Sequence, residues 1–338
     1  MKARLAILAV ILLIAASTID AQKPTVIRVG YFPNLTHAQA LVGRANGQFE
    51  KALGAGVRIE WKAFNAGPLA IEAMFADAID LSYVGPNPTV TGYVRSQGEA
   101  VRVIAGAASG GASLVVRQGA GIQKVSDFHG KKVGTPQLGN TQDIALRAWM
   151  RANGLKPRDK GGDVQVLPIS NPDQLTLFLK GQLDAAWAPE PWAARLVHEG
   201  GGRVFLDERD LWPNHQFVIT DLIVNPKFLK QHPDIIKNFL RAHVELTEWI
   251  DKNPAQAKQI MNHQLQKETG KPLAPEVLDD AFSRMEVTYD PIRSSLLKST
   301  QQAFDEGFLG RTQPDLSGLY DLTLLNEVLR EKKASPIQ

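Results

Sequence analysis

The sequence predicts an α/β fold made of two similar halves. Short β-rich runs alternate with helical patterns along most of the chain, which is typical of α/β proteins with mainly parallel sheets. Several residues recur at a constant offset of 104 positions. The chain has 338 residues, a length that accommodates about two domains.

The first 21 residues have the three parts of a cleavable signal peptide. Lys2 and Arg4 precede the apolar run Leu5–Ala16, and the more polar Ser17–Ala21 ends in a small residue. The apolar run is well short of the ~20 residues that span a bilayer. We therefore expect an exported protein, with an uncleaved anchor as the alternative.

Composition excludes several classes of protein. The chain has no cysteine, which excludes disulfides, cysteine metal sites, a cysteine nucleophile and attachment to lipid through a cysteine. Its formal net charge is +3 and no basic run is present, so we expect no nucleic-acid partner. No later apolar run is long enough to span a membrane. We expect a protein that is free in the periplasm, neither embedded in the membrane nor anchored by lipid.

Nine β-rich runs predict the strands of the two halves. They are Val26–Tyr31, Val57–Trp61, Leu81–Val84, Val101–Ala105, Leu114–Val116, Lys132–Gly134, Val164–Leu167, Leu183–Trp187 and Phe217–Val224. Helical spacing of apolar residues predicts one helix over 140–152 and another over 234–250. The last third of the chain is predicted to be helical.

The recurring residues predict two β-α-β-α-β units. Val29 is matched by Val133, Pro68 by Pro172 and Tyr83 by Trp187, all 104 positions apart. The aligned stretches are MFADAIDLSYVGPNP and FLKGQLDAAWAPEPW. Two similar units in one exported chain imply a cleft between them.

Four loops that follow strands are expected to line this cleft. They are Tyr31–His37, Gly85–Pro88, Thr135–Gln142 and Ala188–Trp192, and each runs directly into a helical pattern. Each therefore presents free backbone N–H groups and the positive end of a helix dipole. Four such helix ends at one cleft form a receptor for an oxyanion.

The chain resembles the substrate-binding proteins of ABC transporters. The resemblance is carried by VGYFPNLTHAQALVG, WAPEPW, VNPKFLKQHPDIIKNFLRA and two strands in which an aspartate precedes an aromatic residue by three positions, Asp80–Tyr83 and Asp184–Trp187. The most similar group is the aliphatic sulfonate, taurine and nitrate family, which shares a fold with thiamine-precursor-binding proteins. The resemblance implies the type II periplasmic binding protein fold, in which two α/β lobes are joined by two crossing strands.

On this plan the resemblance implies a discontinuous first lobe, residues 25–109 plus 221–338, and a second lobe, residues 110–220. The glycines after Ser109 supply pliable backbone at the first crossing. We expect the lobes to close over a solute as a hinge.

The candidate ligand residues lie in the four loops and near the crossings. Thr36 is expected to cap a helix while Asn34 or His37 reaches the ligand. Asn140 and Thr141 are expected to donate hydrogen bonds to the ligand. The alternative is that they only cap the helix. The complete candidate set is Asn34, Thr36, His37, Gly85, Asn87, Ser109, Asn140, Thr141, Gln142, Trp187, Glu190 and Gln216.

Two of the candidates carry a more specific expectation. Trp187 is expected to form an aromatic wall for the tail of a ligand. Glu190 would repel an anion, so it is expected to bind an amino group or ring nitrogen, or to point away. Trp192, in the same loop, is expected either to line the cleft or to pack in the core.

Enzymatic motifs are absent from the sequence. It contains no GxSxG, P-loop, HExxH or CxxC motif, and its seven histidines show no metal-ligand spacing. The fungal thiamine-pyrimidine synthases, which the chain resembles distantly, use a cysteine-rich motif that it lacks. We expect no catalytic residue, no cofactor and no bound metal.

These observations lead to one functional hypothesis and two alternatives. The mature protein is expected to be a monomer that captures a small organic anion, an aliphatic sulfonate first, for an ABC permease and its ATPase. The first alternative is a thiamine-precursor-like heterocycle held by Trp187 and Glu190. The second is an exported ligand sensor that serves a signalling partner.

Overall fold

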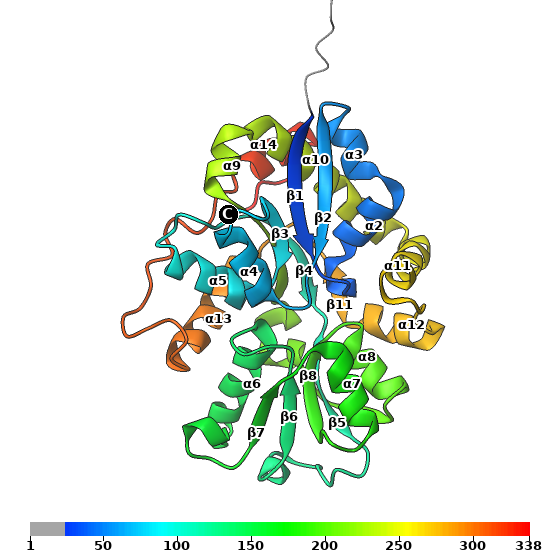
Figure 1. Ribbon diagram of the computed structural model, residues 1–338, viewed down its shortest axis with the longest axis vertical. Coiled ribbons are helices and arrows are strands. Elements are labelled where there is room, and N and C mark those ends of the chain that lie inside the picture. The colour runs from blue at the N-terminus through cyan, green and yellow to red at the C-terminus, as the bar shows by residue number, and fades with distance from the viewer. Residues whose placement is uncertain (1–23) are drawn as a thin grey trace, which may run out of the picture.

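The computed structural model describes residues 24–338 as two α/β lobes, each built on one sheet (Figure 1). The predicted signal peptide lies outside the described residues. The first element of the described part is β1. The first sheet has the order β11-β4-β10-β3-β1-β2, and the second has the order β7-β6-β8-β5-β9. The two-lobed α/β fold that the sequence predicts is confirmed.

The strands of the first sheet are β1 (Thr25–Tyr31), β2 (Val57–Ala63), β3 (Leu81–Val84), β4 (Arg102–Gly110), β10 (Val218–Val224) and β11 (Met285–Val287). Those of the second are β5 (Ala112–Arg117), β6 (Lys132–Thr135), β7 (Gln165–Pro168), β8 (Ala185–Pro189) and β9 (Gly202–Asp207). Each of the nine predicted runs overlaps a strand. The sequence patterns missed β9 and the three-residue β11.

Helices cover both sheets. Those of the first lobe are α2 (Ala38–Asn46), α3 (Gln48–Leu53), α4 (Gly67–Phe75), α5 (Pro86–Arg95), α9 (Pro226–Gln231), α10 (Pro233–Lys252), α11 (Pro254–Thr269), α12 (Pro275–Ser283), α13 (Arg293–Asp305) and α14 (Thr323–Glu331). Those of the second are α6 (Thr141–Ala152), α7 (Asn171–Leu179) and α8 (Trp192–His198). Short 3-10 turns are η1 (Leu35–His37), η2 (Val125–Phe128), η3 (Arg158–Lys160), η4 (Glu208–Leu211) and η5 (Pro213–His215).

The predicted repeat is visible in the register of the strands. Val29 pairs with Leu81 between β1 and β3, and Val133 pairs with Ala185 between β6 and β8. Both members of the second pair lie 104 positions after those of the first. The parallel cores β2-β1-β3 and β7-β6-β8 are therefore equivalent in the two lobes.

The prediction of mainly parallel sheets is wrong, because both sheets are mixed. β10 is antiparallel to β3 and β4, and β5 is antiparallel to β8 and β9. The parallel strands of each sheet end at the cleft, whereas β5 and β10 begin there, because each follows a crossing between the lobes. The strands that join the lobes therefore run against their neighbours.

Two segments connect the lobes. β4 continues into β5 through Gly111, and β9 returns to β10 through η4 and η5. Gly110 and Gly111 have φ of +73° and +76°, a conformation that glycine adopts at low cost. A side chain at Gly110 would lie 2.6 Å from the carbonyl oxygen of Arg284. The lobe limits, 25–109 with 221–338 and 110–220, remain a prediction.

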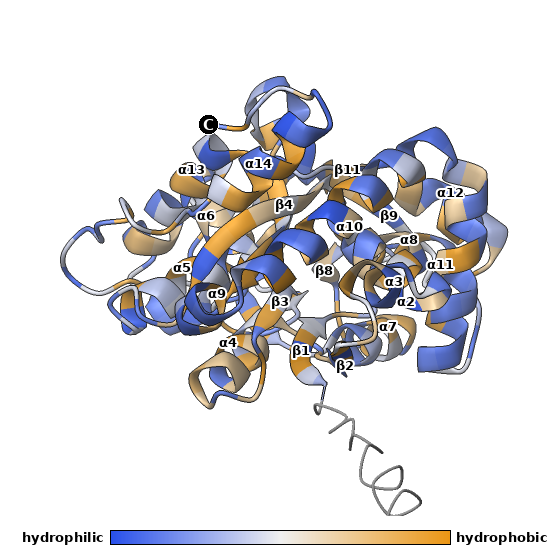
Figure 2. Cartoon of the chain, turned by 90° about the horizontal axis from the view of Figure 1, so that it is seen from above, coloured by the Kyte–Doolittle hydropathy of each residue, from blue (hydrophilic) through white to orange (hydrophobic). Residues whose placement is uncertain are grey.

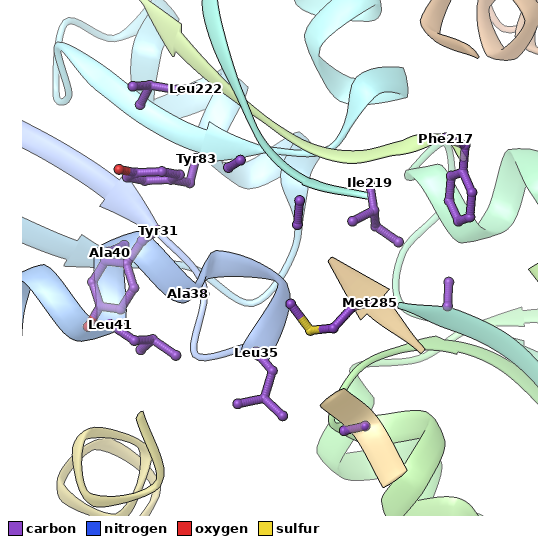
Figure 3. Packing of buried hydrophobic residues seen from close by; sticks show 14 of the residues in the cluster. Tyr31, Leu35, Ala38, Ala40, Leu41, Tyr83, Phe217, Ile219, Leu222 and Met285 are labelled. Atoms are coloured by element: carbon purple, nitrogen blue, oxygen red, sulfur yellow. The ribbon is translucent and has the colours of Figure 1, made fainter. Parts of the chain in front are cut away.

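The apolar core extends from one lobe into the other. Figure 2 shows hydrophobic central strands and hydrophilic outer faces of helices. In Figure 3, Leu35 of the first lobe, Ile219 of β10 and Met285 of β11 lie around the junction. All three belong to a cluster that also contains Ala112 of β5 and Trp187 of β8. Within residues 24–338, none of the helices combines the length and apolar composition that crossing a bilayer requires.

Candidate functional site

A cavity between the lobes brings together seven of the predicted ligand residues. They are Asn34, Thr36, His37, Gly85, Asn140, Thr141 and Gln142. The first four belong to the first lobe and the last three to the second. The free volume is only about 30 Å³, whereas one water needs about 10–15 Å³ on this measure. The cavity therefore fits a small group held from both sides.

The loop after β1 enters the cavity directly. The Oδ1 atom of Asn34 accepts a hydrogen bond from Trp192 Nε1 of the second lobe, at 3.0 Å. This contact fixes the amide and leaves its NH₂ group as a donor. Thr36 lies inside η1, and Asn34 occupies the N-cap position without a side-chain cap. The expectation that Thr36 caps the helix is wrong, because η1 begins one residue before it.

His37 is a neutral donor in this cavity. Its side chain is buried, and its Nδ1 atom accepts a hydrogen bond from the N–H of Phe32 at 3.2 Å. Burial lowers the pKa of His37 to about 3. We therefore assign the ring proton to Nε2, which makes that atom a hydrogen-bond donor without a net charge on the ring.

The loop after β6 is ordered by the start of α6. Asn140 caps the helix, because its Oδ1 accepts from the N–H of Asp143 at 3.0 Å. Its Nδ2 donates to Gln142 Oε1 at 3.0 Å. Gln142 thus has its acceptor occupied and its NH₂ group left as a donor. Capping and site formation are both properties of this loop.

Gly85 allows α6 to approach the first lobe. A Cβ atom at this position would lie 2.3 Å from Thr141 Oγ1, well inside contact distance. Gly85 has φ of −72°, so its backbone does not require glycine. The missing side chain, and not the backbone conformation, is what brings Thr141 against the loop after β3.

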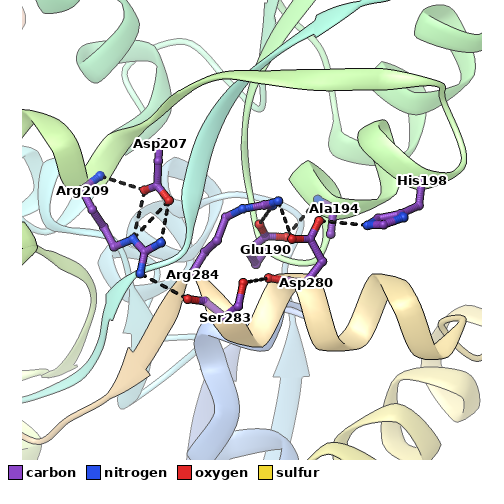
Figure 4. Close-up of polar contacts among 8 residues, drawn as sticks. All are labelled: Glu190, Ala194, His198, Asp207, Arg209, Asp280, Ser283 and Arg284. Atoms are coloured by element: carbon purple, nitrogen blue, oxygen red, sulfur yellow. Dashed lines mark hydrogen bonds and ion pairs between the residues drawn. The ribbon is translucent and has the colours of Figure 1, made fainter.

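The structure places two predicted residues in the core of the second lobe. Trp187 is fully buried, and its Nε1 donates to Glu208 at 2.7 Å, so it forms no wall of the cavity. Glu190 is also fully buried, and its polar contacts are drawn in Figure 4. Its carboxylate accepts from Arg284 Nη1 at 2.9 Å and from the N–H of Ala194 at 3.0 Å. Glu190 binds groups of this chain, which leaves it no role toward a ligand amine.

Three further predicted residues lie outside the cavity. Asn87 exchanges two hydrogen bonds with Ser299 of α13. Ser109 accepts from the N–H of Phe217 at 3.3 Å and joins the crossing strands. Gln216 is exposed in the connector before β10. The first two are packing contacts of the first lobe, since β4, β10 and α13 meet there.

Two asparagines of the cavity were missed. Asn65 follows β2 and Asn171 follows β7, which are equivalent strands of the two lobes. The Oδ1 atom of Asn171 is buried and has no hydrogen-bond partner. The repeat could have predicted both asparagines. In each unit the loops after all parallel strands reach the same edge of the sheet, and these two loops are among them. Thr220 and Phe32 also line the cavity and were not predicted.

The electrostatic character of the cavity favours an anion. Except for the neutral His37, its lining residues have no ionisable side chain. The first residues of α4, α6 and α7 line it, and Gly85 is the N-cap of α5. Helix N-termini carry partial positive charge and free N–H groups. Three of the four predicted helix starts line this cavity, those of η1, α5 and α6. The first residue of α8 does not line it, and the starts of α4 and α7 were not predicted.

A second cavity lies next to the first. Its volume is about 430 Å³, and the two cavities share Asn34, Asn65 and Asn171. Phe64 and Trp192 contribute aromatic surface to it. We call it the outer cavity. Trp192 therefore lines this cavity, whereas Trp187 lines neither cavity.

Ion pairs join the lobes around these cavities. Arg284 of the first lobe pairs with Glu190 at 2.9 Å, and a hydrogen bond of 2.9 Å joins Asp280 to His198 beside it (Figure 4). On another side, Lys160 Nζ lies 2.6 Å from Glu306 Oε2 of the first lobe. The lobes are therefore in contact on both sides of the cleft.

Comparison with known proteins identifies the family. A protein of Bacillus subtilis (strain 168) that is assigned as an aliphatic sulfonates-binding protein is 24% identical over 344 residues, covering 98% of this chain and 97% of its own. The taurine-binding periplasmic protein of Escherichia coli (strain K12) is 24% identical, covering 72% of each chain. Both are named as binding proteins, in agreement with the prediction of a binding protein and not an enzyme.

The fold is shared with solved structures. The alkanesulfonate-binding protein SsuA from Xanthomonas axonopodis pv. citri, bound to MOPS, superposes with a TM-score of 0.72 at 19% identity, over 88% of this chain and 97% of SsuA. The NMT1-like family model matches residues 20–263, which is most of the chain. The resemblance seen in the sequence is thereby confirmed, and the chain belongs to the NMT1-like family.

Proposed function

We propose that this protein is the solute-binding component of an ABC importer and captures a small organic anion, an aliphatic sulfonate first. The observation that carries the proposal is the first cavity. It offers neutral donors and four helix N-termini from both lobes, with no carboxylate among its lining residues. Such a set binds an anion without neutralising it by a fixed positive charge.

The sulfonate head group belongs in the first cavity. Asn34 and His37 donate from the first lobe, and Thr141 and Gln142 donate from the second. A head group with several oxygens can accept from both lobes at once. Only the closed arrangement provides all these donors, so binding is coupled to closure.

The apolar tail of the ligand extends into the outer cavity. Trp192 and Phe64 supply apolar aromatic surface there, and Asn34, Asn65 and Asn171 form the shared wall between the two spaces. This assignment gives Trp192 the role that the sequence suggested for Trp187. The heterocycle alternative loses its support, because Trp187 and Glu190 face other groups.

Delivery requires a permease with its ATPase on the membrane. The predicted signal peptide supports export to the periplasm, and the absence of cysteine excludes attachment to lipid through a cysteine. That the protein acts as a monomer stays a prediction. An exported sensor would have the same cavity and a different partner. A transporter operon beside the gene favours the importer, whereas an adjacent sensor kinase gene favours the sensor.

Thermal-shift titration of the purified mature protein tests the ligand class. A ligand at 100 times its Kd adds about 2.7 kcal/mol to the free energy of unfolding. We expect stabilisation by aliphatic sulfonates, with weaker effects from nitrate and from pyrimidines. Stabilisation by a pyrimidine and by no sulfonate would contradict the proposal.

A charge substitution tests the cavity itself. Gln142→Glu keeps the shape of the side chain and places a carboxylate beside the head group. Because like charges at close range cost several kcal/mol, sulfonate affinity should fall by at least about 100-fold. Gln182→Glu, on an exposed turn of the same lobe, is the matched control and should bind as the wild type. Equal affinities of the two variants would place the ligand elsewhere.

A further inference from the structure

α6 of the second lobe lies beside α13 of the first (Figure 1). A third cavity lies between these two helices. Its volume is about 370 Å³, within the range of small-molecule sites. Its walls come from α6, from the connector that contains Glu208 and Trp212, and from Lys298 and Gln302 of α13. It shares no lining residue with the first cavity or the outer cavity. We call it the α6–α13 pocket.

The helix α6 provides room and an aromatic wall. Ala145, Ala148 and Ala152 lie on one face of the helix, since their spacing is three and then four residues. Their small side chains leave the space open. Trp149 beside them is held by an edge contact with Phe128, with ring centroids 5.2 Å apart. The wall is therefore rigid.

Glu208 places a buried carboxylate in this pocket. The residue is 2% exposed, and its Oε2 atom accepts from Trp187 Nε1 at 2.7 Å. No cationic side chain of the described residues pairs with it. Burial raises the pKa of Glu208 to about 7, although the indole N–H groups of Trp187 and Trp212 act in the opposite direction. A buried carboxylate without a cation is costly, so the ionised form of Glu208 would be stabilised by a positive partner.

Trp212 completes the pocket with an aromatic face and an indole N–H that acts on Glu208. Its ring stacks on Phe217 at 5.4 Å, and its buried Nε1 atom makes no hydrogen bond of normal geometry. Lys298 Nζ lies 4.5 Å from the centre of the ring. The ring therefore makes a cation–π contact with Lys298 at the mouth of the pocket.

We propose that the α6–α13 pocket binds a small organic amine whose ammonium group pairs with Glu208 and whose flat apolar body packs against Trp149 and the alanines of α6. Lys298 is exposed and donates to the carbonyl of Leu211, so solvent screens its charge from the buried end. The amine supplies the cation that Glu208 lacks. The site is independent of the solute in the first cavity, so its failure leaves the proposed function untouched.

Calorimetric titration at pH 8 tests the site with three probes of one shape: benzylamine, benzyl alcohol and benzoate. We expect benzylamine to bind at least about tenfold more tightly than benzyl alcohol, because a hydrogen bond to a charged partner is worth that factor or more. Benzoate should not bind. Absence of benzylamine binding to the wild-type protein, or equal affinity for benzylamine and benzyl alcohol, overturns the proposal.

Variants locate the binding. Glu208→Gln should remove the preference for benzylamine over benzyl alcohol, whereas Glu276→Gln, an exposed carboxamide variant on α12, should keep it. Ala148→Leu fills the pocket and leaves Glu208 intact, so it should weaken both probes. A cooperative thermal unfolding transition, followed by circular dichroism, shows that each variant is folded. Benzylamine binding that survives Glu208→Gln or Ala148→Leu places the amine elsewhere and overturns the proposal.

Discussion

At the scale of single residues, the donors of the first cavity are oriented by partners behind them. Trp192 holds the amide of Asn34, Asn140 holds that of Gln142, and the N–H of Phe32 sets the tautomer of His37. Each contact occupies an acceptor and leaves a donor for the cavity. Neutral, preoriented donors let the protein bind an anion and release it again.

Because no lining group changes its charge, sulfonate affinity should be constant between pH 5 and pH 8. The pKa of His37 is lowered to about 3 by burial, so the imidazole stays neutral throughout this range. Calorimetry at four pH values checks this. An affinity that rises as the pH falls through about 6.5 would indicate an imidazolium in the site and would contradict the assignment.

Gly85→Ala should weaken sulfonate binding at least about tenfold, because its Cβ atom collides with Thr141 Oγ1 in the closed arrangement. Adding Thr141→Ala should recover part of the loss by removing that oxygen. Gly56→Ala is the control, since a Cβ atom there meets nothing within 4 Å. Affinities measured by calorimetry that are equal for Gly85→Ala and Gly56→Ala would show that the contact is unimportant.

Glu208 should make the protein less stable as the pH rises from about 4.5 to about 7. Its pKa is raised from 4.5 to about 7 in the folded state, so the folded state binds a proton that the unfolded state releases. The loss over this window is on the order of 3 kcal/mol. Glu208→Gln should remove this loss. Urea unfolding at pH 5 and pH 8 measures it, and an identical pH dependence of wild type and variant would refute the expectation.

At the scale of elements, strand positions could be predicted but strand directions could not. β-Rich composition identifies β3 and β8, whose runs are apolar and short. The direction of β5 or β10 depends on which sheet each enters after crossing the cleft, and nothing local encodes that. β9 was missed because its residues are half-buried at a sheet edge, where apolar character is weak.

The junction of α12 with the loop before α8 should control closure. Arg284→Met leaves the fully buried Glu190 without its cation, which costs about 3 kcal/mol or more and should lower sulfonate affinity. Adding Glu190→Gln should restore much of the loss. Lys258→Met breaks the more exposed pair with Asp279 and should cost less than about 1 kcal/mol. Urea unfolding measures the loss of stability, and calorimetry measures the sulfonate affinity. An equal loss of stability in Arg284→Met and Lys258→Met would contradict the role of the buried pair.

At the scale of the whole molecule, two equivalent lobes meet at one cavity and are joined by two segments. This arrangement predicts that a sulfonate compacts the protein in solution, because only the closed state offers donors from both lobes. Small-angle X-ray scattering should show a smaller radius of gyration at saturating sulfonate. An unchanged radius, with binding verified by calorimetry, would mean that the lobes do not open.

The sequence by itself determined the α/β class, the two equivalent units and four of the loops that meet at the cleft. These follow from hydrophobic periodicity and from the repeat, which are local properties. Only the tertiary structure decided which loop residues face the cavity. Trp187 lies in β8 and Glu190 in the loop after it, as expected, yet Glu208 and Arg284 engage them from distant segments. Asn65 and Asn171 reach the cavity because the lobes face each other. The direction of a side chain depends on partners far away in sequence, and those partners meet only in the folded chain.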